Sequence, residues 1–193
     1  AGAGGWGNLM ASVENEEAAA NNQTAAGISR AYRNLGAKKM LIIPVAFQDK
    51  TNSPFSSSSV SDDRVSDIQA YFNRCSFGKF TLPNIVIAPL QTLSKNASHY
   101  TSYNTLKNEA KALVASAHDP DDFDFHCLVI NHNLFSWAGL ANVGDNTSWI
   151  DGRNSGNGLD QDVRVYIHEL GHNLGLFHAN AWNPTSSTQP DDT

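Results

Sequence analysis

Three histidines lie close together in the stretch HELGHNLGLFH, from His168 to His178. In an α-helix, positions i and i+4 lie about 40° apart around the axis and one turn apart along it, so His168 and His172 can direct both imidazoles to one point. Gly175 can adopt the left-handed conformation that ends a helix and reverses the chain. The reversal lets His178 return to the same point from another direction. The spacing therefore predicts a metal site with three histidine ligands.

The chemistry predicted for this site is hydrolysis. Three imidazole nitrogens leave the fourth tetrahedral position to water, which is the arrangement of a catalytic rather than a structural zinc. Zinc (Zn2+) suits imidazole and has no redox function, although cobalt, nickel or copper would also accept three histidines. Glu169 lies beside the first histidine and can reach the water without binding the ion. We predict that its carboxylate takes a proton from the water and passes it to the leaving amine of an amide.

The structural alternative is an amphipathic helix whose polar face carries the histidines by chance. Val163, Ile167, Leu170 and Leu174 follow one another at steps of four, three and four, which gives the helix an apolar face to bury. This alternative leaves the fixed spacing of the histidines, Glu169 and Gly175 to coincidence, which occurs in a chain of this length on the order of 10⁻⁴ of the time. We therefore favour the metal site.

The remaining sequence predicts alternating strands and helices that position the site. Strands are expected in KKMLIIPVAFQ (38–48), around 85–87, in FDFHCLVIN (123–131), in AGLANVG (138–144) and in TSWID (147–151). Helices are expected from Ser61 to a stop at Gly78, from an N-cap at Asn104 to a stop at Pro120, and through the histidines. Such alternation predicts one α+β domain with a mixed sheet covered by helices. Residues 1–37 are expected to be a lead-in to this domain of residues 38–193, and Pro44 predicts a sheet edge or a bulge nearby.

Composition limits the partners. The 193 residues have a formal net charge of -6, with 40% hydrophobic and 17% charged residues, as in an ordinary globular protein. No cluster of five or more lysines and arginines occurs, so no nucleic-acid partner is expected. The apolar runs are far shorter than the roughly 20 residues of a membrane-spanning helix, so no membrane partner is expected either. Cys75 and Cys127 can form one disulfide or remain free thiols.

The motif HExxHxxGxxH, here His168, Glu169, His172, Gly175 and His178, resembles the signature of the metzincin zinc endopeptidases. The longer stretch HELGHNLGLFHANAW, with IIPVAF and CSFGKF upstream, is most similar to the gametolysin branch, which consists of secreted or cell-wall proteases that digest glycoproteins. The resemblance implies a secreted zinc metalloendopeptidase that acts on protein or glycoprotein substrates. It also implies that the histidines bind one catalytic zinc and that Glu169 is the general base.

The resemblance further implies the upper subdomain of the metzincin fold, which is a twisted mixed β-sheet with a backing helix and an active-site helix. The edge strand of that sheet binds an extended polypeptide substrate through main-chain hydrogen bonds, and its counterpart here is 138–144, with Gly139, Leu140 and Ala141 as substrate contacts. The methionine turn that follows the third histidine in metzincins has no counterpart, because Met10 and Met40 both lie upstream. The lower subdomain is therefore expected to be largely absent from this chain and to belong to a C-terminal remainder of the same protein.

Two alternatives concern binding rather than catalysis. The acidic stretch HDPDDFDFH (118–126) and the loop 145–162 could bind calcium (Ca2+), although a solvated turn explains their carboxylates equally well. The second functional hypothesis is a noncatalytic module that zinc stabilises and that binds an extracellular protein or glycan. The intact Glu169 argues against this hypothesis, because a structural zinc site does not need a general base.

Overall fold

The structure is a computed structural model. It describes residues 34–55, 58–130, 134–135, 137–151, 163–178, 181–182 and 190–191. Most of the predicted lead-in (1–33) and most of the second candidate calcium loop (152–162) lie outside the described residues.

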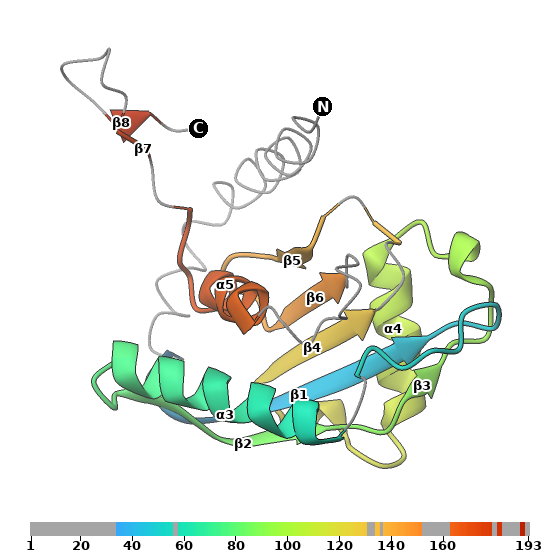
Figure 1. Ribbon diagram of the computed structural model, residues 1–193, viewed down its shortest axis with the longest axis horizontal. Helices are drawn as coiled ribbons and strands as arrows, with labels where there is room; N and C mark the ends of the chain where they lie inside the picture. The colour runs from blue at the N-terminus through green and yellow to red at the C-terminus, as the bar shows by residue number, and fades with distance from the viewer. Residues whose placement is uncertain are drawn as a thin grey trace.

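Six strands form one twisted mixed sheet (Figure 1). In spatial order, five of them are β2 (Phe80–Ile87), β1 (Gly36–Ala46), β4 (Phe125–Ile130), β6 (Thr147–Asp151) and β5 (Gly139–Ala141). The sixth strand, β3 (Gln91–Thr92), pairs with β1 beyond the end of β2. Neighbouring strands are parallel, except that β5 runs antiparallel to β6. An antiparallel strand therefore lies at one end of the sheet.

The described residues form three α-helices, which cover both faces of the sheet (Figure 1). They are α3 (Ser58–Cys75), α4 (Tyr103–Val114) and α5 (Val163–Asn173). Two 3₁₀ turns, Ala97–His99 and Pro120–Asp122, lie in the connections, and the short strands β7 (Ala181–Trp182) and β8 (Pro190–Asp191) pair with each other. The predicted α+β class, with a mixed sheet and three helices, is confirmed. None of the described helices is long and apolar enough to cross a membrane.

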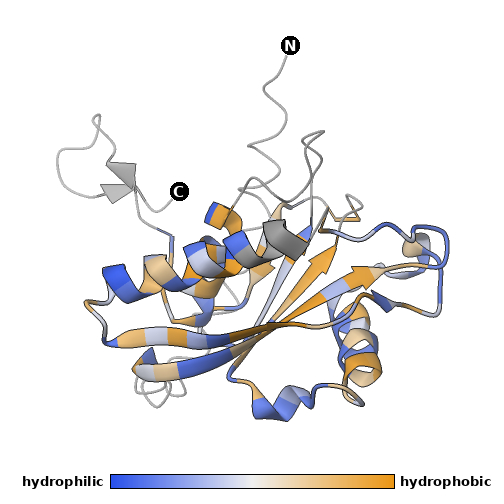
Figure 2. Ribbon diagram, turned by 60° about the horizontal axis from the view of Figure 1, so that its bottom comes forward, coloured by the Kyte–Doolittle hydropathy of each residue, from blue (hydrophilic) through white to orange (hydrophobic). Residues whose placement is uncertain are grey.

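The alternation of side chains along β1 divides the hydrophobic core into two layers. Leu41 and Ile43 pack in the cluster that contains α4, whereas Met40 and Ile42 pack in the cluster that contains α3 and α5. This division follows from the geometry of a strand, in which successive side chains point to opposite faces of the sheet. All four side chains are at most 1% exposed. Figure 2 shows the corresponding concentration of hydrophobic residues in the central strands.

Pro44 does not mark a sheet edge, because β1 has neighbours on both sides. On one side, the pairing of β1 with β2 ends at Ile42 and the pairing with β3 begins at Val45. In a strand, residues two apart direct their main-chain N–H and C=O groups to the same side. The Ile42 carbonyl accepts a hydrogen bond from the Ala88 N–H on this side, so the missing N–H of Pro44 faces the same side. Pro44 therefore falls in the gap between two partner strands, where the loss of a donor interrupts neither ladder.

The predicted limits of the second helix are wrong at both ends. The N-cap of α4 is Ser102 rather than Asn104, and the helix ends at Val114, before a separate 3₁₀ turn that begins at Pro120. Serine and asparagine are equally good N-caps, so local sequence does not distinguish the two starts. The burial of Leu106, Ala110 and Val114 in the core decides the register instead.

Candidate metal centre

The imidazoles of His168, His172 and His178 converge at the C-terminal end of α5. Their Nε2 atoms lie 3.0 Å apart for His168 and His178, and 3.1 Å apart for each pair that includes His172. At zinc–nitrogen distances of about 2.0–2.1 Å, nitrogens at tetrahedral corners lie about 3.3–3.4 Å apart, so this cluster fits a single ion. In the described part of the chain, no second group of three His, Cys, Asp or Glu residues comes close enough to bind a metal.

The electrostatic environment keeps His168 ready to bind a cation. Although the residue as a whole is exposed, desolvation of its ring lowers its pKa to about 4, and the neighbouring His172 and His178 add to this shift. An imidazole with this pKa is neutral near pH 7, so its nitrogen lone pair is available to a metal. His168 therefore suits zinc in charge, and the three histidines together suit it in geometry.

The turn at Gly175 brings His178 back to the end of the helix. Gly175 has a φ of +94° and donates its N–H to the His172 carbonyl at 2.8 Å, while the Leu176 N–H donates to the Gly171 carbonyl at 3.0 Å. These two bonds form the Schellman motif, which satisfies the last carbonyls of a helix. The Leu176 carbonyl in turn accepts a hydrogen bond from His172 Nδ1 at 2.8 Å. This bond leaves Nε2 unprotonated and directed at the cluster.

Replacing Gly175 by alanine should weaken both the fold and the metal site. A left-handed residue with a side chain costs roughly 1–2 kcal/mol, and any shift of the turn moves His178 away from its two partners. We expect a loss of about 1 kcal/mol in the free energy of unfolding and a zinc affinity about 10-fold lower, measured by denaturant titration and by competition with a zinc chelator. Gly78→Ala is the matched control, because Gly78 also follows a helix with a positive φ, +73°, and an added Cβ there would meet Asn73 Oδ1 at 3.6 Å and no histidine. It should lose stability and keep its zinc affinity; an unchanged affinity in Gly175→Ala would contradict the positioning of His178 by the turn.

Glu169 and the predicted edge strand lie next to each other. Glu169 is buried, with 5% of its surface exposed, on the helix that packs against β5 and β6. The predicted strand 138–144 is shorter than expected, since β5 contains only Gly139, Leu140 and Ala141. Leu140 and Ala141 are 5% and 1% exposed, whereas Gly139 is half-buried, so Gly139 is the most accessible residue of this strand.

Comparison with known families agrees with the geometry of the site. A profile of the gametolysin peptidase M11 family matches residues 20–186, which include the whole main sheet and the three histidines. The chain belongs to the gametolysin family. Among curated proteins, no significant match was found. Membership supports a peptidase that uses a metal, and the histidine cluster is where the metal could bind.

In this gametolysin-family chain, Asn173 is a residue of the site that the sequence interpretation missed. Its side-chain amide donates to the carbonyls of Thr147 at 3.1 Å and Asn142 at 3.3 Å, and the Gly144 N–H donates to the His172 carbonyl at 2.9 Å. These bonds fasten the histidine end of α5 to the connection between β5 and β6. The sequence does point to Asn173, because it lies three residues after Leu170 on the apolar face of the helix, where a polar side chain needs hydrogen-bond partners.

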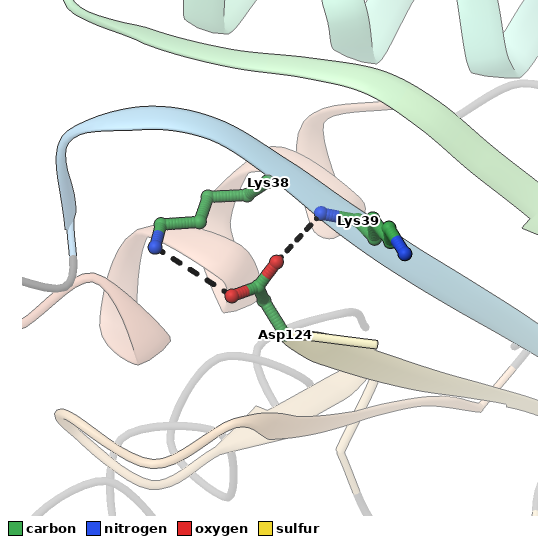
Figure 3. Close-up of polar contacts among 3 residues, drawn as sticks. All are labelled: Lys38, Lys39 and Asp124. Atoms are coloured by element: carbon green, nitrogen blue, oxygen red, sulfur yellow. Dashed lines mark hydrogen bonds and ion pairs between the residues drawn. The ribbon is translucent and has the colours of Figure 1, made fainter. Parts of the chain in front are cut away.

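The first acidic stretch has structural uses in the gametolysin-family fold. The Asp119 carboxylate accepts a hydrogen bond from the Asp121 N–H at 3.0 Å and caps a 3₁₀ turn. Asp124 accepts a bond from the Lys39 N–H at 2.8 Å and pairs with Lys38 Nζ at 3.5 Å, so it joins the start of β4 to β1 (Figure 3). These contacts account for both carboxylates without an ion. Calcium binding by this stretch remains a prediction.

The two cysteines of this gametolysin-family chain are free thiols. Cys75 is exposed at the end of α3, and Cys127 is buried in β4. Burial raises the pKa of Cys127 to about 12; a hydrogen bond with Ser148 lowers this pKa and the charge of Glu169 raises it. The thiol therefore stays protonated, and it does not belong to the group of side chains that could hold a metal.

Proposed function

We propose that this protein is a secreted zinc-dependent endopeptidase that hydrolyses peptide bonds in protein or glycoprotein substrates. The observation that carries the proposal is the convergence of three histidine Nε2 atoms within 3.1 Å of one another, two from the helix that carries the buried Glu169 and one from the turn after it. Membership of the gametolysin family supports the peptidase class. The resemblance to metzincins supports secretion and the assignment of the sheet, α3 and α5 to an upper subdomain of that fold.

The residues of the chain divide the work of hydrolysis. His168, His172 and His178 hold the zinc ion, which supplies a Lewis acid that polarises the substrate carbonyl and makes water more acidic. Glu169 accepts the proton of the attacking water as the oxygen–carbon bond forms, and it then delivers this proton to the amine nitrogen as the carbon–nitrogen bond breaks. The products are a carboxylic acid and an amine, which ionise to a carboxylate and an ammonium group near pH 7.

The substrate is proposed to lie along β5. Within the described residues, β5 pairs only with β6, so its other edge can add an extended polypeptide through main-chain hydrogen bonds. The proposed contacts are main-chain hydrogen bonds of Gly139, Leu140 and Ala141, and the half-buried Gly139 is the most accessible of the three residues. This arrangement would place a scissile bond beside the helix that carries Glu169, because β5 packs against α5.

Removal of the metal tests this proposal. Treatment of the full natural protein with a zinc chelator should abolish cleavage of casein, and one equivalent of zinc should restore it, because the three imidazoles form a single site. Cleavage is followed by release of labelled peptides, and bound metal by mass spectrometry. Cleavage that continues in fully metal-free protein would contradict the proposal. One bound zinc without any cleavage would instead identify a noncatalytic module.

A further inference from the structure

Gly139 lies on β5 opposite the side chain of Glu169. A Cβ atom at this position would overlap Glu169 Oε1, and it would lie only 2.7 Å from both Glu169 Cγ and Val165 Cγ1. Carbon atoms that are not bonded to each other pack at about 3.5–4.0 Å. We propose that Gly139 is a positioning residue, whose missing side chain leaves the space that the Glu169 carboxylate occupies. The inference rests on the proposed role of Glu169 as general base.

Backbone conformation does not explain this glycine. Among the described glycines, those with positive φ are Gly36, Gly78, Gly144 and Gly175, and Gly139 is not one of them. Gly139 pairs with Ile150 as part of β5, and its backbone conformation is one that any L-residue can adopt. A glycine inside a strand weakens the strand and often marks the close approach of another group. Here the approaching group is the carboxylate of Glu169, so the position requires space and not backbone freedom.

The surroundings of Glu169 leave its carboxylate little freedom to move aside. Val165 and Glu169 are four residues apart on α5, so they share the helix face that meets β5, and His172 is the next neighbour along that face. Glu169 and His172 are 5% and 7% exposed. The charge of Glu169 also raises the pKa of the fully buried Cys127 on β4. The main chain of β5 at Gly139 thus forms one wall of a closely packed site around the carboxylate.

A methyl group at position 139 must displace the carboxylate, and small displacements are costly for a general base. A shift of about 1 Å in a reacting group can lower a rate about 100-fold. We therefore expect Gly139→Ala to lower kcat on a peptide substrate by about 10- to 100-fold. KM should stay within about twofold, and one zinc should remain bound, because the ligand nitrogens do not contact Gly139.

A control is Gly78→Ala, which adds the same methyl group after the end of α3. Its Cβ would lie 3.6 Å from Asn73 Oδ1, an ordinary van der Waals contact, so kcat should not change. The double variant Gly139→Ala with Val165→Ala separates packing from positioning, because it removes the collision with Val165 Cγ1 and leaves both collisions with Glu169. Stability should recover in this double variant while kcat stays low. A full recovery of kcat would show that Gly139 serves packing alone.

Cobalt-loaded protein gives a readout that does not depend on hydrolysis. The visible spectrum of Co2+ bound by histidines responds to the groups around the ligands. Gly139→Ala should change this spectrum in the same direction as Glu169→Ala. It should cause no further change in the Glu169→Ala background, where both colliding atoms of Glu169 are gone and only Val165 Cγ1 remains close.

The two kinds of measurement keep the inference separate from the proposed function. If the natural protein cleaves no peptide, the proposed function fails, and the cobalt spectra still decide whether Gly139 positions Glu169. Identical spectra for the natural protein and Gly139→Ala would overturn the inference. The inference would also be overturned if Gly139→Ala changed the cobalt spectrum equally in the natural protein and in the Glu169→Ala background. Loss of bound zinc in Gly139→Ala would overturn it as well.

Discussion

Glu169→Gln is expected to lower peptide hydrolysis by about 10²- to 10⁴-fold while one zinc ion stays bound. Glutamine has the shape of glutamate, so it fits the same space beside Gly139 and Val165. Its amide cannot accept the proton of the attacking water, and the loss should therefore appear in kcat rather than in KM. The measurement is steady-state cleavage of a labelled peptide, combined with metal analysis of the purified protein.

Glu109→Gln provides a control with the same chemical change in a different place. The Glu109 carboxylate, on α4, accepts hydrogen bonds from the Ser94 N–H at 2.6 Å and the Tyr100 hydroxyl at 2.7 Å. Its replacement should lower stability and leave kcat unchanged, because α4 packs on the opposite face of the sheet from α5. Full activity of Glu169→Gln would remove Glu169 from the mechanism, and another base would have to be sought.

The second large effect is expected for His172→Ala, which should lose zinc. His172 is the most buried of the three histidines, and its Nε2 lies 3.1 Å from the Nε2 atom of each of the other two. Loss of a group that only supports a ligand typically weakens metal binding about 10- to 100-fold, so loss of a ligand should cost at least about 100-fold. Competition with a chelating dye measures this affinity.

Thermal unfolding gives an independent test of the same variant. A ligand that binds only the folded state raises the unfolding temperature, so added zinc should stabilise the natural protein and fail to stabilise His172→Ala. His99→Ala is the control, because His99 is exposed, lies outside the cluster and should leave both measurements unchanged. Unaltered zinc affinity in His172→Ala would refute the three-histidine site.

The metal cluster could be predicted from sequence because its geometry is local. The helical period places His168 and His172 on one side of a helix, and one left-handed glycine, Gly175, is enough to return His178 to them. The central strands could also be predicted from the sequence, since continuous apolar runs such as 40–43 are typical of strands buried on both faces. In both cases the deciding interactions lie within a few residues of one another along the chain.

Tertiary structure alone decided how these local elements meet. The contact between Gly139 and Glu169 requires β5 to pair antiparallel with β6 and α5 to pack across both, and no local pattern encodes either arrangement. The same holds for Asn173, whose partners belong to another part of the chain, and for Pro44, whose missing donor falls between two strands. Residue spacing thus determined which groups could bind a metal, because a helix has a fixed period. Long-range packing determined what surrounds Glu169, because that depends on the order in which distant strands pair.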